Sequence, residues 1–109
     1  MKKIGGNITA TLKAKTQTTN AIGEKVSTWE HYKDIRGFLD FASETTGRAN
    51  YNSKIVESTH VFVCDYVEID KKEADLKFYC DNKEFDITYI DDPMNLHYHL
   101  EIFLKYIGD

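Results

Sequence analysis

Residues 76–90 decide the fold class, and they read Leu-Lys-Phe-Tyr-Cys-Asp-Asn-Lys-Glu-Phe-Asp-Ile-Thr-Tyr-Ile. Apolar and polar side chains alternate in residues 76–80 and again in residues 83–90, and this period of two is typical of β-strands. One face of the second segment carries Phe85, Ile87 and Tyr89. Between the segments, Asp81 and Asn82 both tolerate a positive φ, which suits a two-residue hairpin turn. The stretch therefore predicts an antiparallel β-hairpin.

Residues 96–107, farther along the chain, fit two patterns. All the even positions carry large apolar side chains, as in a strand with one buried face: Leu96, Tyr98, Leu100, Ile102, Leu104 and Tyr106. A helical stripe also fits, through Leu96, Leu100, Phe103, Leu104 and Ile107. Residues 91–95, Asp-Asp-Pro-Met-Asn, form a predicted turn before this segment. We predict a strand, because the alternation is the longer match and it follows a series of strands.

Upstream of the hairpin, residues 8–15 alternate regularly and predict a strand, followed by a turn at residues 18–23. Residues 25–41 predict a long strand whose apolar side chains fall on both parities. Such a strand has a bulge, a strong bend or two buried faces, and Gly37 is a candidate for the bend. Residues 54–67 predict another strand, joined to the hairpin by a charged connection.

These segments predict an all-β fold of about six strands, which closes most economically into a small antiparallel barrel or sandwich without exposed edges. The chain has 109 residues, so we expect one domain over residues 1–109. No apolar run approaches the about 18 residues of a membrane helix, and no secretory signal is visible. Membrane proteins, secreted disulfide scaffolds and disordered tails are therefore not expected.

Charge is unevenly distributed along the chain, whose net charge is -4. Residues 1–54 hold nine Lys or Arg and five Asp or Glu, whereas residues 55–109 hold five and thirteen. An acidic chain is a poor candidate for broad binding to nucleic-acid phosphates. A basic first half and an acidic second half fit a subunit that stacks between two different neighbours. The alternative is that the difference reflects only the charges of strand ends and turns.

Metal binding has one candidate motif, His97-Tyr98-His99, because residues i and i+2 of a strand point the same way. A third ligand would come from His60, Asp91, Asp92 or Glu101; the alternative is a solvent-facing polar strip.

Asp91-Asp92 before Pro93 fits an Asx-type turn better than a catalytic pair. Ser43 and Ser58 lack local support as nucleophiles, and no phosphate loop or nucleophile elbow occurs, so we expect neither an enzyme nor a cofactor. Cys64 and Cys80 match no zinc or redox spacing, and we expect reduced thiols in apolar surroundings rather than a disulfide.

Residues 42–53 interrupt the alternation and contain no aliphatic side chain larger than Ala. Loops of about 12 residues are long for a compact domain and are usually functional or disordered. Most of the seven Tyr and six Phe are expected in the core and on strand faces, and some in subunit contacts. Tyr51, inside the polar loop, is the most exposed candidate.

Four segments, in this order and spacing, resemble the head-closure proteins (head–tail joining or stopper proteins) of long-tailed phages and prophages of Gram-positive bacteria. Residues 29–41, with Ile35-Arg36-Gly37-Phe38-Leu39-Asp40, resemble the family's second strand before its long loop. Residues 50–63 resemble the strand that returns from the loop, residues 82–93 a later hairpin, and residues 99–106 the last strand.

The resemblance implies a β-barrel subunit in a ring of about twelve copies beneath the portal and its adaptor. Such a ring closes the DNA-filled head, offers a surface for the tail, and belongs to the virion after assembly in the host cytoplasm. By position, residues 42–53 would project into the channel and touch viral DNA transiently. With Arg48 as its only base and Glu44 as its only acid, the loop would act by steric blockage. The candidate channel residues are Ser43, Glu44, Thr45, Thr46, Gly47, Arg48, Asn50 and Tyr51.

Two alternatives stay open at this point. A tail-completion or neck subunit on the tail side would also be a small β-protein of the virion. A metal- or ligand-binding barrel that uses His97 and His99 is the alternative from another functional class.

Overall fold

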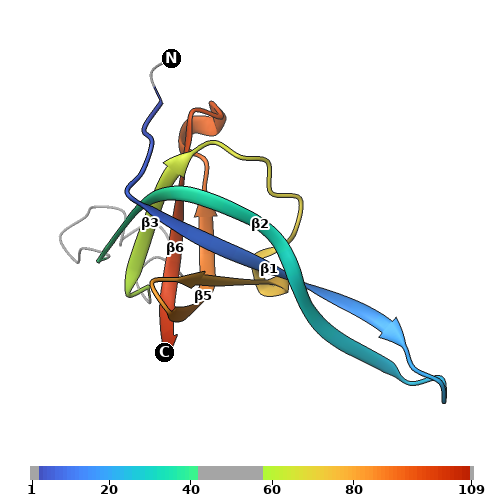
Figure 1. The fold of residues 1–109 in the computed structure, drawn as a ribbon. Coiled ribbons are helices and arrows are strands. Elements are labelled where there is room, and N and C mark those ends of the chain that lie inside the picture. The colour runs from blue at the N-terminus through green and yellow to red at the C-terminus, as the bar shows by residue number, and fades with distance from the viewer. Residues whose placement is uncertain (1–2, 42–57, 109) are drawn as a thin grey trace.

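The computed structural model describes residues 3–41 and 58–108, in which the strands form one closed antiparallel barrel (Figure 1). Their order around the barrel is β1-β2-β3-β6-β5-β4. The strands are β1 (Ile8–Thr19), β2 (Lys25–Phe41), β3 (His60–Asp65), β4 (Leu76–Cys80), β5 (Lys83–Asp91) and β6 (His99–Gly108). Two short 3₁₀ turns, η2 (Glu73–Asp75) and η3 (Pro93–Asn95), precede β4 and β6. The predicted all-β barrel is confirmed, and the sandwich is not formed.

Three predicted boundaries need correction. β1 continues to Thr19 instead of residue 15, because residues 16–19 pair with residues 25–28 of β2. The strand predicted at residues 54–67 is present as His60–Asp65; residues 54–57 lie outside the described residues. The last segment is a strand and not a helix, but it begins at His99, since positive φ angles at Met94, Asn95 and His97 break the extended backbone before it.

The hairpin predicted for residues 76–90 is present. β4 pairs with β5, and Asp81 and Asn82 take φ angles of 54° and 60° between them. Both are residues that tolerate the left-handed conformation, which a two-residue turn needs to match the twist of the strands.

The core fills the barrel with side chains from all six of these strands. The largest fully buried side chains are Phe62, Phe78, Phe85, Leu12, Ile102, Leu104 and Cys64. Phe78 packs edge-on against Phe62, at 5.1 Å between ring centroids, and against Phe85, at 5.9 Å. Edge-to-face rings of this kind add to the hydrophobic stabilisation of burial.

Cys64 and Cys80 are free and buried, so the prediction of reduced thiols in apolar space is confirmed and the disulfide is excluded. Burial raises the pKa of the Cys64 thiol to about 12. Because the thiolate is the reactive form of cysteine, both burial and the raised pKa disfavour reaction of Cys64 in the folded protein.

The mixed parity of β2 has its cause at Tyr32. Leu12 of β1 pairs with Lys33 and Lys13 with His31, so that Tyr32 is an extra residue in β2. This β-bulge exchanges the two faces of the strand, and a bulge was one of the three alternatives that the mixed parity left open. The Tyr32 hydroxyl then bonds the carboxylate of Asp70, and Asp70 N–H donates back to it at 3.0 Å. The bulge thereby ties β2 to the connection between β3 and β4.

Gly37 lies where β2 passes from one neighbour to the next, pairing with Ile8 of β1 and Cys64 of β3. A Cβ at this position would lie 2.3 Å from the carbonyl oxygen of Val63 and 2.7 Å from the ring of Phe62. Only a hydrogen atom fits in this space. Gly37 is therefore needed for close approach between backbones, which is a more specific role than the predicted bend.

The hairpin of β1 and β2 extends well beyond the barrel (Figure 1). Pairing between β1 and β4 covers residues 11–14 and, among the described residues, goes no farther. Beyond it, residues 15–19 and 25–29 pair only with each other in the part of the chain described. We call Lys15–Trp29 the arm; it gives the molecule its principal extents of 51 × 29 × 28 Å.

We predict that Gly37→Ala lowers the free energy of unfolding by about 1–3 kcal/mol, because a backbone shift must relieve the overlap with Val63. Gly108→Ala is the matched control, since nothing lies within 4 Å of its added Cβ. Urea unfolding followed by fluorescence measures both. Equal midpoints for the two variants would contradict this account of Gly37.

Candidate functional site

Asp92 organises the turn between β5 and β6. Its Oδ1 accepts the His97 N–H at 3.0 Å, its Oδ2 bonds His97 Nδ1, and its carbonyl accepts the Asn95 N–H at 2.9 Å. This carboxylate is therefore engaged in holding a turn, which agrees with the Asx-type turn expected at Asp91-Asp92.

Backbone strain is concentrated in the same turn, at Met94, Asn95 and His97, whose φ angles are 57°, 54° and 58°. Positive φ is costly for residues other than Gly and persists where surrounding contacts enforce it. In and after this turn, Met94 is 86% exposed, and Leu96 and Tyr98 also face solvent.

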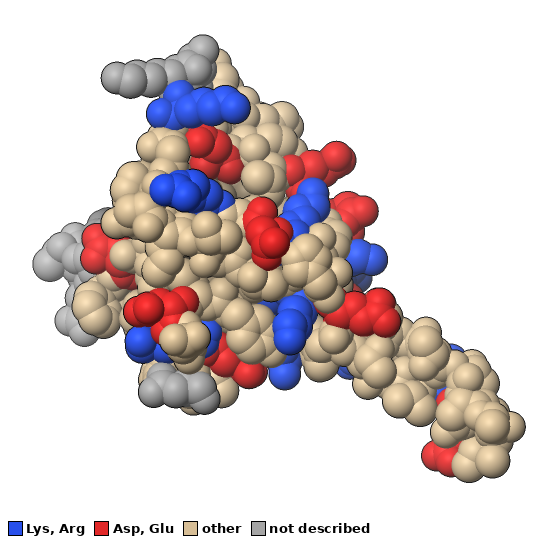
Figure 2. Space-filling model, in the orientation of Figure 1, with Lys and Arg blue, Asp and Glu red and all other residues tan. Residues whose placement is uncertain are grey.

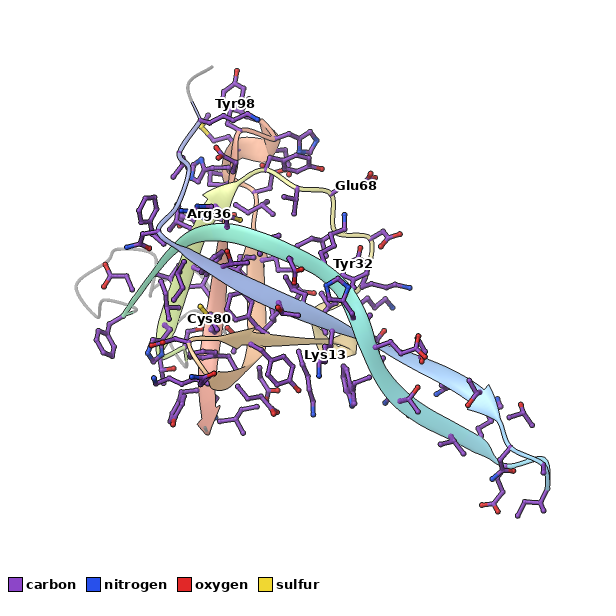
Figure 3. The ribbon with its side chains drawn as sticks, viewed as in Figure 1. Lys13, Tyr32, Arg36, Glu68, Cys80 and Tyr98 are labelled. Atoms are coloured by element: carbon purple, nitrogen blue, oxygen red, sulfur yellow. The ribbon has the colours of Figure 1, made fainter. Side chains whose placement is uncertain are left out.

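Tyr66 lies beside this turn, with its ring centroid 4.6 Å from that of His97 and its N–H bonded to the Tyr98 carbonyl at 3.3 Å. We call Tyr66, Met94, Leu96 and Tyr98 the turn patch; Figure 3 shows Tyr98 at this end of the barrel. Asp65 nearby accepts the N–H groups of Ile4 and Gly5 at 2.7 and 3.0 Å, and these bonds hold its pKa below the usual value. The N-terminal segment is thereby anchored at the same end.

A second cluster lies where β3 begins, at the other end of the β3–β6 pair. The His60 ring lies 4.9 Å from that of Phe41, 6.3 Å from that of Tyr106, and edge-on to buried Phe85 at 5.0 Å. Phe41 is 75% exposed and Tyr106 is also exposed. We call Phe41, His60 and Tyr106 the aromatic patch. Aromatic groups presented to solvent in this way are common in protein contacts.

Burial in the aromatic patch lowers the pKa of His60, and the charge of Lys83 lowers it further.

The two histidines of the metal hypothesis do not share a strand face, which corrects that prediction. His97 precedes β6 in the strained turn and bonds Asp92, whereas His99 is the first residue of β6 and its Nε2 lies 3.3 Å from Glu101 Oε2. His60 lies in the aromatic patch at the other end of the strands. Within residues 3–41 and 58–108 there is no group of three or more His, Cys, Asp or Glu placed to hold a metal ion.

The candidate channel residues, Ser43 to Tyr51, lie outside the described residues. Ser58 is described, and its hydroxyl lies 2.6 Å from that of Thr88, which in turn donates to the Phe103 carbonyl at 3.0 Å. These contacts hold strand backbones together.

The arm was not predicted from the sequence, although the uncharged, threonine-rich run at residues 16–23 is a signal for an exposed ribbon.

Residues 6–106 match the family model described as phage head completion protein. The chain belongs to the phage head completion protein family. It is thus a structural protein of the virion, and the resemblance drawn from the sequence to head-closure proteins is confirmed at the level of the family. No curated protein matches the sequence.

Two solved structures share the fold. The solution structure of protein SF1141 from Shigella flexneri 2a aligns with a TM-score of 0.74 at 16% identity, covering 97% of this chain and 96% of that one. A chain from the virion of a native gene transfer agent particle aligns with a TM-score of 0.58 at 13% identity, covering 94% and 96%. At these identities the comparison shows the fold alone. None of the helices in the described part of the chain has the length and apolar character needed to cross a membrane.

We predict that acid destabilises the protein through His60. Its pKa in the folded state is below the ordinary value of 6.5, so the unfolded state takes up the proton first and stability falls as pH drops below that value. Removing this group by His60→Gln flattens the dependence of the urea midpoint on pH between about 7.5 and 5.5. His31→Gln, at an exposed histidine, keeps the loss that His60 causes. Parallel pH curves for the wild type and His60→Gln would refute this assignment.

Proposed function

We propose that this head completion protein is a subunit of the head–tail connector. It closes the DNA-filled head beneath the portal and adaptor and provides the surface to which the tail attaches. The observation that carries the proposal is the family match over residues 6–106.

The positions of the two patches support a place between two neighbours. The turn patch lies where β3 ends and β6 begins, and the aromatic patch lies where β3 begins and β6 ends. A subunit that must bind one assembly above and another below needs contact surfaces at two ends of a rigid body. Apolar side chains exposed at both ends of a closed barrel meet that need.

We further propose that the whole chain acts as a single domain, one of about twelve copies in a closed ring. Residues 42–53 are proposed to reach the central channel, where several copies of a nearly neutral loop block DNA by their bulk. The acidic balance of the chain supports weak, transient contact with DNA, since a basic lining would hold the phosphates.

The proposed role is mechanical and needs neither catalysis nor a cofactor. Its site of action is the neck of the virion, after assembly in the host cytoplasm. Portal or adaptor proteins on the head side and tail proteins on the tail side are the proposed partners.

Electron microscopy of particles made with this gene disrupted tests the proposal. We expect free tails beside tailless heads that have lost DNA, because an unclosed head neither retains DNA nor binds a tail. Wild-type copies supplied from a plasmid restore tailed particles.

Normal tailed particles without the protein would overturn the proposal. Tailless heads that keep their DNA would overturn the head-closure role and assign the chain to the tail side, as a tail-completion or neck subunit.

A further inference from the structure

Neither edge of the arm has a strand partner among residues 3–41 and 58–108. The outer edge of β1 loses its partner β4 after Ala14. On the other edge, the connection between β3 and β4 bonds the side chains of Tyr32 and Lys33, which lie between the arm and the barrel. From Lys15 to Thr19 on one side and from Lys25 to Trp29 on the other, the arm is a ribbon of two strands. Ribbons of two strands are marginally stable in water, and open edges are templates for further pairing.

The charged side chains of the arm are confined to Lys15, Glu24 and Lys25, so much of both edges lacks the usual protection. Natural proteins place charges, Pro or bulges on such edges to prevent pairing with other chains. Residues 16–23 contain no charged side chain and no Pro, and four of them are Thr, Thr, Thr and Ile, which favour strands. Figure 2 shows the contrast between the mostly uncharged arm and the barrel, which is scattered with both charges.

The arm is nevertheless built to keep its shape. At the tip, Asn20 Oδ1 accepts the N–H groups of Ile22 and Glu24 at 3.1 and 2.9 Å, and the Asn20 N–H bonds the Glu24 carbonyl. The hydroxyls of Thr16 and Thr28 lie 2.8 Å apart across the strands. An ordered ribbon with a rigid tip loses little conformational freedom when it pairs, which favours binding.

The direction of the free N–H groups follows from the alternation of an antiparallel pair. Because the Asn20 N–H points to Glu24, the pair Thr18 and Val26 is also hydrogen-bonded, whereas at Gln17 and Ser27 the N–H groups point outward. Each strand of the arm therefore presents backbone donors and acceptors along its outer edge.

A second copy of this chain is the occupant that uses both edges. In a ring, every subunit has the same orientation relative to the axis, so β1 of one arm faces β2 of the next and the two run antiparallel. Such a head-to-tail contact repeats around the ring and leaves no edge open when the ring closes. A partner that bound one edge would leave the other exposed in every subunit.

We infer that the arms of neighbouring copies pair edge to edge, β1 of one copy against β2 of the next, to form a continuous β-collar around the connector. This inference rests on the proposed ring, and it adds which surface joins its subunits.

Disulfide trapping tests the collar in assembled particles. One strain produces two versions of the protein, Gln17→Cys and Ser27→Cys, so that the two thiols are always on different copies. The native thiols of Cys64 and Cys80 are buried and stay out of the reaction. We expect a disulfide-linked dimer in purified particles that carry the mixture. Particles with either variant alone serve as controls and give none, because equal strands of adjacent arms are about 10 Å apart, beyond the reach of a disulfide.

A second experiment does not depend on register. Gln17→Pro and Ser27→Pro remove the outward N–H groups, whereas Gln17→Ala and Ser27→Ala keep them. We expect the proline variants to be lost from particles in competition with the wild type and the alanine variants to be retained. Thermal unfolding of each purified variant verifies that the barrel still folds.

Absence of the mixed dimer, with proline variants incorporated as well as alanine variants, would overturn the collar while leaving the connector role intact. A dimer formed by Gln17→Cys alone would overturn it by showing β1 against β1. If wild-type particles lack the protein altogether, the proposed function fails first, and the collar with it.

Discussion

At Gly37 the backbones of β1, β2 and β3 approach so closely that no side chain fits between β2 and the Val63 carbonyl. The barrel closes through this seam, because the pairing of β2 with β3 in the described part of the chain runs from Gly37 to Phe41. The rest of this 17-residue strand remains with β1. One strand thus belongs to two structures, a closed barrel at one end and a ribbon of two strands at the other, and the ribbon begins where β1 loses its pairing with β4 after Ala14.

This division separates stability from assembly. The barrel has a core of interlocking Phe rings and closed edges, all supplied by this chain. The surfaces that we propose for contact with other proteins lie outside the core: apolar side chains on a strained turn at one end, aromatic rings at the other, and a ribbon that reaches outward. A separation of the core from the contact surfaces suits a structural protein of the virion, because such a protein must be stable before assembly and must bind other subunits during assembly.

Much of the barrel could be predicted from the sequence because burial on one face of a strand leaves a period of two. Residues 96–107 show this well: alternation identified the strand over the competing helical stripe. The start of that strand was wrong, since nothing in the pattern reports the positive φ angles at Met94 and His97, and the error placed two histidines on one face. The arm was hidden for a related reason. Alternation shows which face of a strand is buried, but it does not show whether an edge has a partner, which depends on residues far away in the chain. The mixed parity of residues 25–41 was visible, but neither the position of the bulge at Tyr32 nor the interaction of Tyr32 with Asp70 could be predicted from it.

Hydrogen exchange, followed by mass spectrometry on the purified protein and on intact particles, tests the division between barrel and arm most directly. The account predicts slow exchange of the barrel amides in both samples, and fast exchange of the outward-pointing amides of residues 15–29 in the purified protein that becomes slow in particles. Amides of residues 15–29 that exchange equally fast in both samples would contradict it, because they would show an arm that gains no partner on assembly.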